Sequence, residues 1–127
     1  GHRMDTAMLM CPYFKVAPGQ REAFSASCDA FYQSAVESEG VLFYGTAQND
    51  EGVHVRQGYR SAEAMVSHLQ QTEVHMSRTL ETAQLERVEV HGTRKQIATV
   101  RRHTTKIGST DMQFFETHPK MYSVAKP

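Results

Sequence analysis

The sequence predicts an α+β domain of ferredoxin-like topology, a βαββαβ unit followed by a C-terminal helix-strand extension. Four short segments within the first 92 residues carry the apolar and β-branched residues that are typical of strands. Two longer stretches between them have apolar residues at helical spacing. The resulting order is strand, helix, strand, strand, helix, strand.

The first strand and helix are expected before residue 40. Residues 7–16, AMLMCPYFKV, read as a strand, but Pro12 cannot donate to a β-ladder and requires a bulge, an edge position or a later start. A Pro-Gly turn follows, and a helix is expected from near Gln20. Its apolar stripe consists of Phe24, Cys28, Phe31 and Ala35. Gly40 is expected to end this helix.

A β-hairpin is expected next. Residues 41–47 alternate as a strand, and residues 48–52, QNDEG, are typical of a hairpin turn. In the returning strand, residues 53–59, side chains alternate between two faces. One face carries Val53, Val55, Gln57 and Tyr59, and the other carries His54 and Arg56.

The second helical region and the last strand complete the unit. Ser61 is a good N-cap for a helix that carries Met65, Val66 and Leu69. A further helical stretch is expected from Thr72. Residues 85–92, LERVEVHG, predict the last strand, with Val88 and Val90 facing inward.

The C-terminal extension has its own pattern. Ile97, Val100 and Ile107 predict a basic helix that Gly108 ends, and residues 111–116, DMQFFE, predict one more strand. We therefore expect one domain over residues 5–127, with its core in residues 7–92 and its extension in residues 93–127. Residues 1–3, Gly-His-Arg, resemble a residual tag and are left out of the fold argument.

The composition is that of an ordinary folded domain. Hydrophobic residues make up 39% of 127 residues and the formal net charge is zero, so no global field attracts nucleic acid or a membrane surface. Two cysteines without metal-ligand spacing, Cys11 and Cys28, indicate a reducing compartment. With no membrane-spanning stretch or signal peptide, we expect a cytoplasmic protein.

The basic residues of the extension permit two interpretations. No acidic residue lies between Thr93 and Thr110, whereas five basic ones do: Arg94, Lys95, Arg101, Arg102 and Lys106. An anionic partner such as nucleic acid is one interpretation. A solvated outer face on a packed helix is the other, and we favour it.

Three motifs carry a resemblance to a known family. In order and spacing, VAPGQREAF, SEGVLFYG and GYRSAEAMVSHL resemble the antibiotic biosynthesis monooxygenase (ABM) domain over roughly Met8 to Gly92. The resemblance implies pairing as a dimeric α+β barrel, a homodimer in which two sheets face each other. It also implies a pocket between sheet and helices. Members include cofactor-free monooxygenases, haem-degrading enzymes and proteins of unknown activity.

The sequence departs from two patterns of that family. Pro12, His68 and Arg78 stand where the haem-degrading branch has Asn, Trp and His, so haem degradation is not expected. Gln57 stands two residues before Tyr59, where the family often has an acidic residue. A neutral amide cannot act there as a general base.

Cofactor-free oxygenation requires a base, donors that hold a phenolate, and an apolar wall. His68 is the candidate base or orienting group, because histidine titrates near neutral pH and the family commonly has a histidine there. Tyr59 and Tyr44 are candidate donors. For each of the three, structural packing is the alternative.

Five further residues are candidates for substrate binding. Phe14, Met65 and Leu69 are expected to form the pocket wall. Arg56 and His54 either face the pocket, where Arg56 would hold an anion, or lie in the dimer interface, which we favour. His75, His91 and His118 lack ligand spacing, so neither a metal site nor a cofactor is expected.

The function expected from these residues is cofactor-independent monooxygenation of a phenolic or quinol-like small molecule. A non-catalytic dimeric barrel that binds a small apolar ligand is the alternative, because Gln57 replaces the acidic residue. An isomerase or lyase that uses the same base without oxygen is a third possibility. In each case the partners are a second copy of the chain and a small aromatic molecule, without nucleic acid or membrane.

Overall fold

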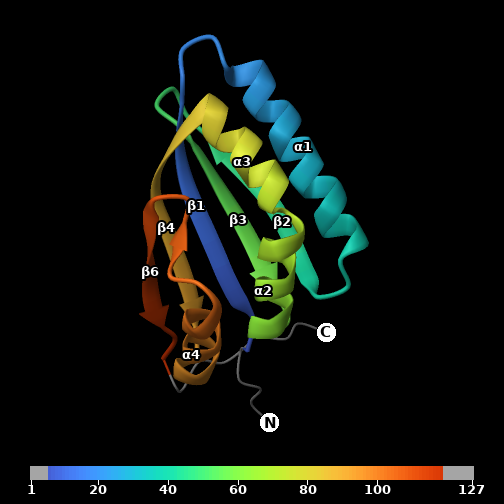
Figure 1. Ribbon diagram of the computed structural model, residues 1–127, viewed down its shortest axis with the longest axis vertical. Coiled ribbons are helices and arrows are strands. Elements are labelled where there is room, and N and C mark those ends of the chain that lie inside the picture. Colours follow the sequence, from blue (N-terminus) through green and yellow to red (C-terminus); the bar gives the residue numbers. More distant parts are fainter. Residues whose placement is uncertain (1–5, 119–127) are drawn as a thin grey trace, which may run out of the picture.

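A six-stranded sheet with four helices on one face makes up the structure, a computed structural model that describes residues 6–118 (Figure 1). The tag-like residues 1–3 and the outer limits of the expected domain, residue 5 and residues 119–127, lie outside the described residues.

The elements follow the predicted order. They are β1 (Met8–Val16), α1 (Arg21–Glu37), β2 (Val41–Gln48), β3 (Val53–Tyr59), α2 (Ala62–Gln71), α3 (Glu73–Thr82), β4 (Ala83–Gly92), α4 (Arg94–His103), β5 (Lys106–Ile107) and β6 (Thr110–Glu116). The strand order in the sheet is β2-β3-β1-β4-β6-β5. β1 pairs antiparallel with β3 and β4, whereas β6 adds parallel to β4. The α+β, ferredoxin-like prediction is confirmed.

The core lies between the sheet and the helices. Met8, Met10 and Phe14 alternate along β1 toward the helices and are almost completely buried. The expected stripe of α1 is also found, with Phe24, Phe31 and Ala35 buried and Cys28 half-buried. Because each large apolar side chain contributes about 1.5–3 kcal/mol on burial, this layer fixes the helices against the sheet.

Pro12 lies in the middle of a central strand, so an edge position and a later start are both wrong. β1 pairs with β3 at Met10 and again at Tyr13, but no pair is formed at Pro12 itself. On the other side, the register with β4 shifts between Tyr13 and Phe14. A local irregularity therefore accommodates the missing N–H.

Gly40 does not cap α1 as predicted. The helix ends at Glu37, and the N–H of Ser38 donates to the carbonyl of Ala35 at 3.1 Å. A Cβ atom on Gly40 would lie 2.4 Å from Cβ of Ala64 in α2. The glycine is thus explained by close approach of the chain to α2, not by helix termination.

The extension forms a shorter helix than predicted. A capping box at Thr93 and Gln96 starts α4. The helix ends at His103, because the Thr104 hydroxyl donates to the carbonyl of Lys106 at 2.8 Å and forms a turn. Ile107 therefore belongs to β5, and Gly108, at φ +58°, makes the turn into the expected strand β6.

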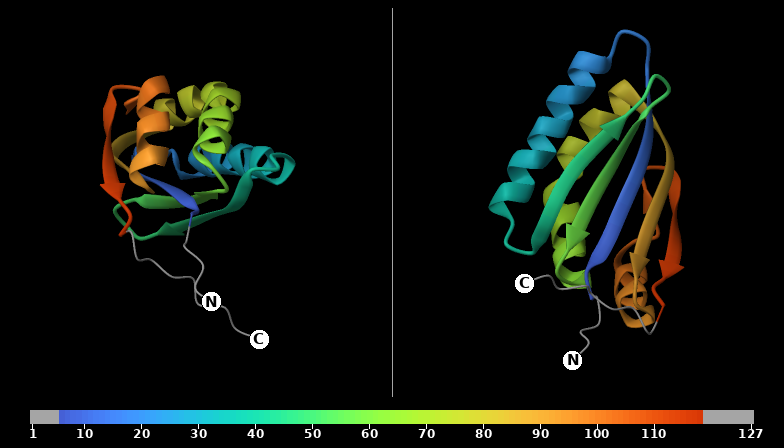
Figure 2. Two further views of the ribbon diagram at one scale, coloured as in Figure 1. Left: turned by 90° about the horizontal axis from the view of Figure 1, so that it is seen from below. Right: turned by 180° about the vertical axis from the view of Figure 1, so that it is seen from behind.

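The second face of the sheet carries no helix in the described part of the chain (Figure 2). It presents Glu89, which accepts from Arg87 at 2.6 Å and is bonded to His91 at 2.9 Å. Phe43 and Phe115 are about half exposed there. None of the described helices is long and apolar enough to cross a membrane.

Candidate functional site

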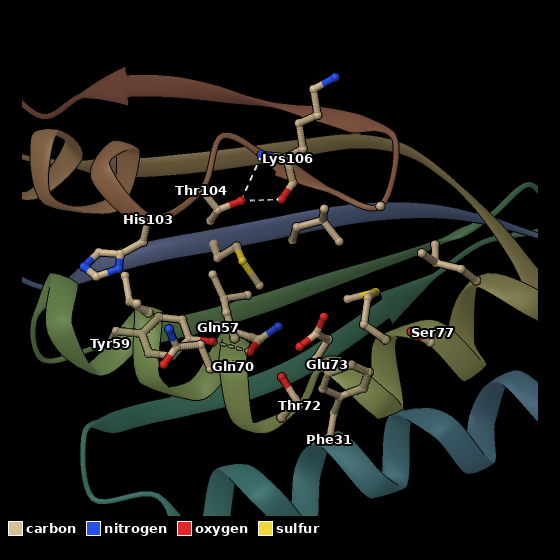
Figure 3. Close-up of a pocket in the computed structure, with 17 residues that line it drawn as sticks. Phe31, Gln57, Tyr59, Gln70, Thr72, Glu73, Ser77, His103, Thr104 and Lys106 are labelled. Carbon is tan, nitrogen blue, oxygen red and sulfur yellow. Dashed lines mark hydrogen bonds between the residues drawn. The ribbon is translucent and has the colours of Figure 1, made fainter.

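A cavity of about 310 Å³ lies between the sheet, helices α1–α3 and the C-terminal extension (Figure 3). The sheet contributes Met10, Gln57 and Tyr59, and α1 contributes Phe31. The α2–α3 region contributes Val66, Leu69, Gln70, Thr72, Glu73, Met76, Ser77 and Leu80. The extension contributes His103, Thr104, Lys106, Ile107 and Gly108. The size and mixed lining suit a small molecule with an apolar body and a few polar groups.

Three buried polar side chains meet at the sheet side of this cavity. The Tyr59 hydroxyl donates to Oε1 of Gln57 at 2.7 Å and is also bonded to Nδ1 of His68 at 2.9 Å. Gln57 and Tyr59 share a face of β3 because they are two residues apart. His68 comes from α2, whose start is fixed by Ser61, which accepts from the N–H of Ala64.

Proton positions in this group follow from its donor count. A tyrosine hydroxyl has one proton, so it donates to only one of its two partners and accepts from the other. The Gln57 amide can present either its oxygen or its nitrogen. If Tyr59 donates to Gln57, Nδ1 of His68 carries the ring proton and donates to Tyr59. If Tyr59 donates to Nδ1 of His68, the Gln57 amide nitrogen donates to Tyr59, and Nε2 carries the ring proton. The His68 ring is neutral in both arrangements.

His68 is held in its neutral form. It is 2% exposed, and its Nε2 has no hydrogen-bond partner among the described residues. Burial lowers the pKa of His68 below its ordinary value of 6.5, and the nearby His75 lowers it further. Burial also raises the pKa of Tyr59. The pair is therefore a neutral imidazole beside a protonated phenol, and the imidazole can accept a proton through the hydroxyl.

Glu73 is a lining residue that sequence reasoning missed, and among the described residues that line the cavity it is the only carboxylate. It lies in the first turn of α3, where the helix dipole favours a negative charge. Leu69, Thr72, Glu73, Met76 and Leu80 recur at helical spacing and all line the cavity. That spacing could have predicted from the sequence that Glu73 shares a helix face with the apolar residues of the cavity wall. The sequence carries no such signal for the lining residues of the extension, because their approach to the cavity depends on the pairing of β6 with β4.

Of the predicted wall residues, Leu69 lines the cavity, whereas Phe14 and Met65 do not. Phe14 packs against Phe24 with ring centroids 5.2 Å apart, and Met65 is completely buried. Tyr44 also lies away from the cavity. Its hydroxyl is bonded to the Cys28 thiol, and burial raises the pKa of both groups.

His54 and Arg56 lie on the uncovered face of the sheet, away from Tyr59 and His68. The His54 ring packs edge-on against Tyr13, with centroids 4.1 Å apart. Arg56 lines a shallow pocket together with Cys11 and Phe43. This placement separates both residues from the cavity, so the prediction that Arg56 holds an anion there is not supported by its position.

The described residues bring together no group of three or more His, Cys, Asp or Glu side chains that could hold a metal ion. In the extension, Arg94 pairs with Glu116 at 3.4 Å and Lys106 with Asp111 at 3.6 Å. Arg101 lies over the ring of Phe114 at 4.3 Å. These partners favour the interpretation of α4 as a solvated outer face.

Comparisons with solved structures agree with the topology. MupZ from Pseudomonas fluorescens superposes with a TM-score of 0.83 at 28% identity, and the match covers 97% of each chain. A mutant form of SnoaB, a cofactor-independent oxygenase from Streptomyces nogalater, has a TM-score of 0.62 at 12% identity over 71% of this chain and 95% of its own. A predicted antibiotic biosynthesis monooxygenase from Chloroflexus aurantiacus has a TM-score of 0.57 at 18% identity over 67% of this chain and 90% of its own.

The match to MupZ includes the extension, because only 3% of the chain lies outside it. No protein-family model matches the sequence, and no curated protein does. The shared architecture is that of a ferredoxin-like unit. In its fold, the chain is similar to solved antibiotic biosynthesis monooxygenase-like proteins.

Proposed function

We propose that this protein is a cofactor-independent monooxygenase that oxidises a phenolic or quinol-like small molecule in the cavity of about 310 Å³. The observation that carries the proposal is the hydrogen-bonded group of Tyr59, His68 and Gln57 at the cavity wall. The fold of this protein is similar to that of SnoaB, a cofactor-independent oxygenase, and this similarity supports the same reaction class.

The proposed reaction begins with proton transfer. The step uses the arrangement in which the Gln57 amide nitrogen donates to Tyr59 and Tyr59 donates to Nδ1 of His68. The substrate hydroxyl then gives its proton to the Tyr59 oxygen as Tyr59 gives its own proton to Nδ1. The resulting phenolate passes one electron to O₂, and recombination of the two radicals forms a C–O bond to a peroxide. The peroxide anion takes up one proton, which replaces the proton that the substrate gave to Tyr59. The hydroperoxide then loses water with the hydrogen of the same carbon and leaves the quinone, so one O₂ is consumed and one water is released per turnover.

The chain supplies the surroundings that this sequence needs. Met10, Leu69 and Ile107 provide apolar surface against an aromatic ring. Gln57 and Tyr59 provide hydrogen-bond donors for the developing anion. Because His68 is buried and neutral, it accepts a proton without first having to lose one.

Oxygen uptake with a panel of polycyclic phenols and hydroquinones tests this proposal. We expect one O₂ consumed per substrate, and a fall in kcat of about 10²–10⁴-fold for Tyr59→Phe and for His68→Gln. Tyr32→Phe is the matched control, because Tyr32 is 50% exposed on α1. Uptake that is unchanged in Tyr59→Phe would contradict the assignment.

A second candidate is an isomerase or lyase that uses the same cavity without oxygen. Glu73 favours it, because a carboxylate and the Tyr59–His68 pair together provide two acid–base groups around one bound molecule. Product formation under nitrogen at the rate seen in air, together with its loss in Glu73→Gln, would establish this candidate in place of the first. A protein that binds phenols without turnover under either gas would be a non-catalytic binder.

We also propose that the chain pairs as a homodimer through the uncovered face of the sheet. That face presents half-exposed Phe43 and Phe115, and Phe115 contacts Arg87 and His91 of the polar group that they form with Glu89. An apolar and polar mixture of this kind is typical of interfaces between subunits. The two free cysteines support a cytoplasmic location.

A further inference from the structure

Glu73 interrupts an apolar stripe along the helical wall of the cavity of about 310 Å³. Helical spacing places Leu69, Glu73, Met76 and Leu80 on one face of the α2–α3 region, and all four line the cavity. The turn at Thr72 keeps this register, since its carbonyl accepts from the N–H of Met76 at 2.9 Å. The carboxylate therefore stands at a position where packing alone would favour another apolar side chain.

The Glu73 carboxylate has no partner in the described part of the protein. Figure 3 shows its side chain pointing into the cavity. It forms no hydrogen bond or ion pair with another described residue, His103 included. The Lys106 ammonium does not supply one, because it points away from the cavity in Figure 3 and lies 3.6 Å from Asp111. The cavity thus offers a ligand a negative charge that no cation of the protein balances by direct contact.

A bound ring would change the surroundings of this carboxylate. Without a ligand, Glu73 is exposed and its oxygens are hydrated. A ring that rests against Met76 and Ile107 would displace part of that water. A carboxylate that loses water without gaining a hydrogen bond raises the free energy of the complex, and a second negative charge nearby raises it further. A ligand with a hydrogen-bond donor at this position avoids both costs.

We infer that Glu73 selects the ligand of this cavity by charge: the site takes phenols that carry a second hydrogen-bond donor, above all an ammonium group, and disfavours phenols that carry a carboxylate. An ammonium group donates to the carboxylate and neutralises it, whereas a hydroxyl donates without neutralising it. A carboxylate on the ligand does neither. Affinity should therefore fall in this order.

The second donor belongs on a substituent of the ring, not at the reacting hydroxyl. In the proposed function, Tyr59 takes the proton of the reacting hydroxyl on the sheet side of the cavity, from β3. Glu73 reaches the cavity from α3, on the helix side. The inference deepens the proposed function and rests on it for the phenol ring.

Binding of three naphthols that differ in one substituent tests the inference. At neutral pH, 5-(aminomethyl)-1-naphthol is a cation, 5-(hydroxymethyl)-1-naphthol is neutral, and 5-hydroxy-1-naphthoic acid is an anion. Kd is measured by ¹³C-methyl NMR titration of Met10 and Met76, which line the cavity. In the wild type at low ionic strength, we expect Kd to rise by about threefold or more from the cation to the neutral ligand, and again to the anion.

Glu73→Gln keeps the size of the side chain and removes its charge. The Kd of the cation should rise and that of the anion should fall, until the two agree within about twofold. Glu81→Gln is the matched control, because Glu81 is an exposed residue of the same helix that does not line the cavity. Both Glu81→Gln and His103→Gln should keep the wild-type order.

Equal Kd values for the three naphthols in the wild type would overturn the inference, as would an order that persists in Glu73→Gln or is lost in His103→Gln instead. It would also be overturned if the cationic and the neutral naphthol failed to shift Met10 and Met76. If the order is found but none of the three naphthols supports oxygen uptake, the proposed function fails while the selection by charge stands. Oxygen uptake with equal Kd values would have the opposite meaning.

Discussion

Removal of the Tyr59 hydroxyl should destabilise the protein measurably. In Tyr59→Phe the ring remains, but Oε1 of Gln57 and Nδ1 of His68 lose partners at 2.7 and 2.9 Å. All three side chains are at most 2% exposed, so the two atoms are left largely shielded from bulk water. A buried polar atom left without a partner costs about 1–3 kcal/mol, and two such atoms set an expected loss of about 2 kcal/mol or more in the free energy of unfolding.

Urea unfolding followed by circular dichroism measures this loss. A domain of this size is stable by about 5–15 kcal/mol, so a change of about 2 kcal/mol moves the midpoint clearly. Tyr32→Phe removes the same hydroxyl from a half-exposed ring and should change the stability by less than about 0.5 kcal/mol. A loss below about 0.5 kcal/mol in Tyr59→Phe would refute the reasoning that this hydroxyl satisfies two buried groups.

A double-mutant cycle makes the test more specific. Gln57→Leu and Tyr59→Phe should be coupled by about 0.5–3 kcal/mol, because the two residues share one hydrogen bond. Gln57→Leu combined with Tyr32→Phe should be additive. Additivity in both cycles would show that the bond between Tyr59 and Gln57 does not contribute to stability.

Three further predictions concern pH, packing and assembly. Burial lowers the pKa of His68, so as the pH falls below about 6.5 the histidine of the unfolded state is protonated before that of the folded state. The free energy of unfolding should therefore decline more below this pH in the wild type than in His68→Gln. Urea unfolding that shows the same pH dependence for both proteins would contradict this. Gly40→Ala should cost about 1–3 kcal/mol because its Cβ would lie 2.4 Å from that of Ala64, and Ala64→Gly in the same chain should recover part of the loss in thermal unfolding. Phe43→Glu on the uncovered face should halve the mass seen by native mass spectrometry without lowering the helix content, whereas a wild type that is already monomeric would contradict the homodimer.

Local sequence patterns predicted most of the fold because each element is specified within its own residues. The helix α2 begins after Ser61, whose side chain accepts the expected hydrogen bond. The turn of residues 48–52 is closed by the Asn49 side chain, which accepts from the N–H groups of Glu51 and Gly52. Gly40 was misread because a helix stop and a close contact between elements require the same residue type.

The candidate site was only partly predictable. Tyr59 and His68 were each recognised as polar residues on elements that face a core, and the structure brings them into contact. Phe14 and Met65 face the same layer, but alternation cannot distinguish a side chain that fills the core from one that lines a cavity. The wall formed by His103 and Ile107 was not predictable, because it depends on long-range pairing of β6 with β4.

Binding of a small phenol in the cavity can be observed directly through the methionine methyl groups. Met10 and Met76 line the cavity, whereas Met8, Met65 and Met112 are buried elsewhere and serve as internal controls. In a ¹³C-methyl NMR titration with 1-naphthol or 1,4-naphthohydroquinone, we expect saturable shifts of Met10 and Met76 that Ile107→Trp abolishes. Shifts that do not saturate, or that are equal at the control methionines, would contradict the assignment of this cavity as the small-molecule site.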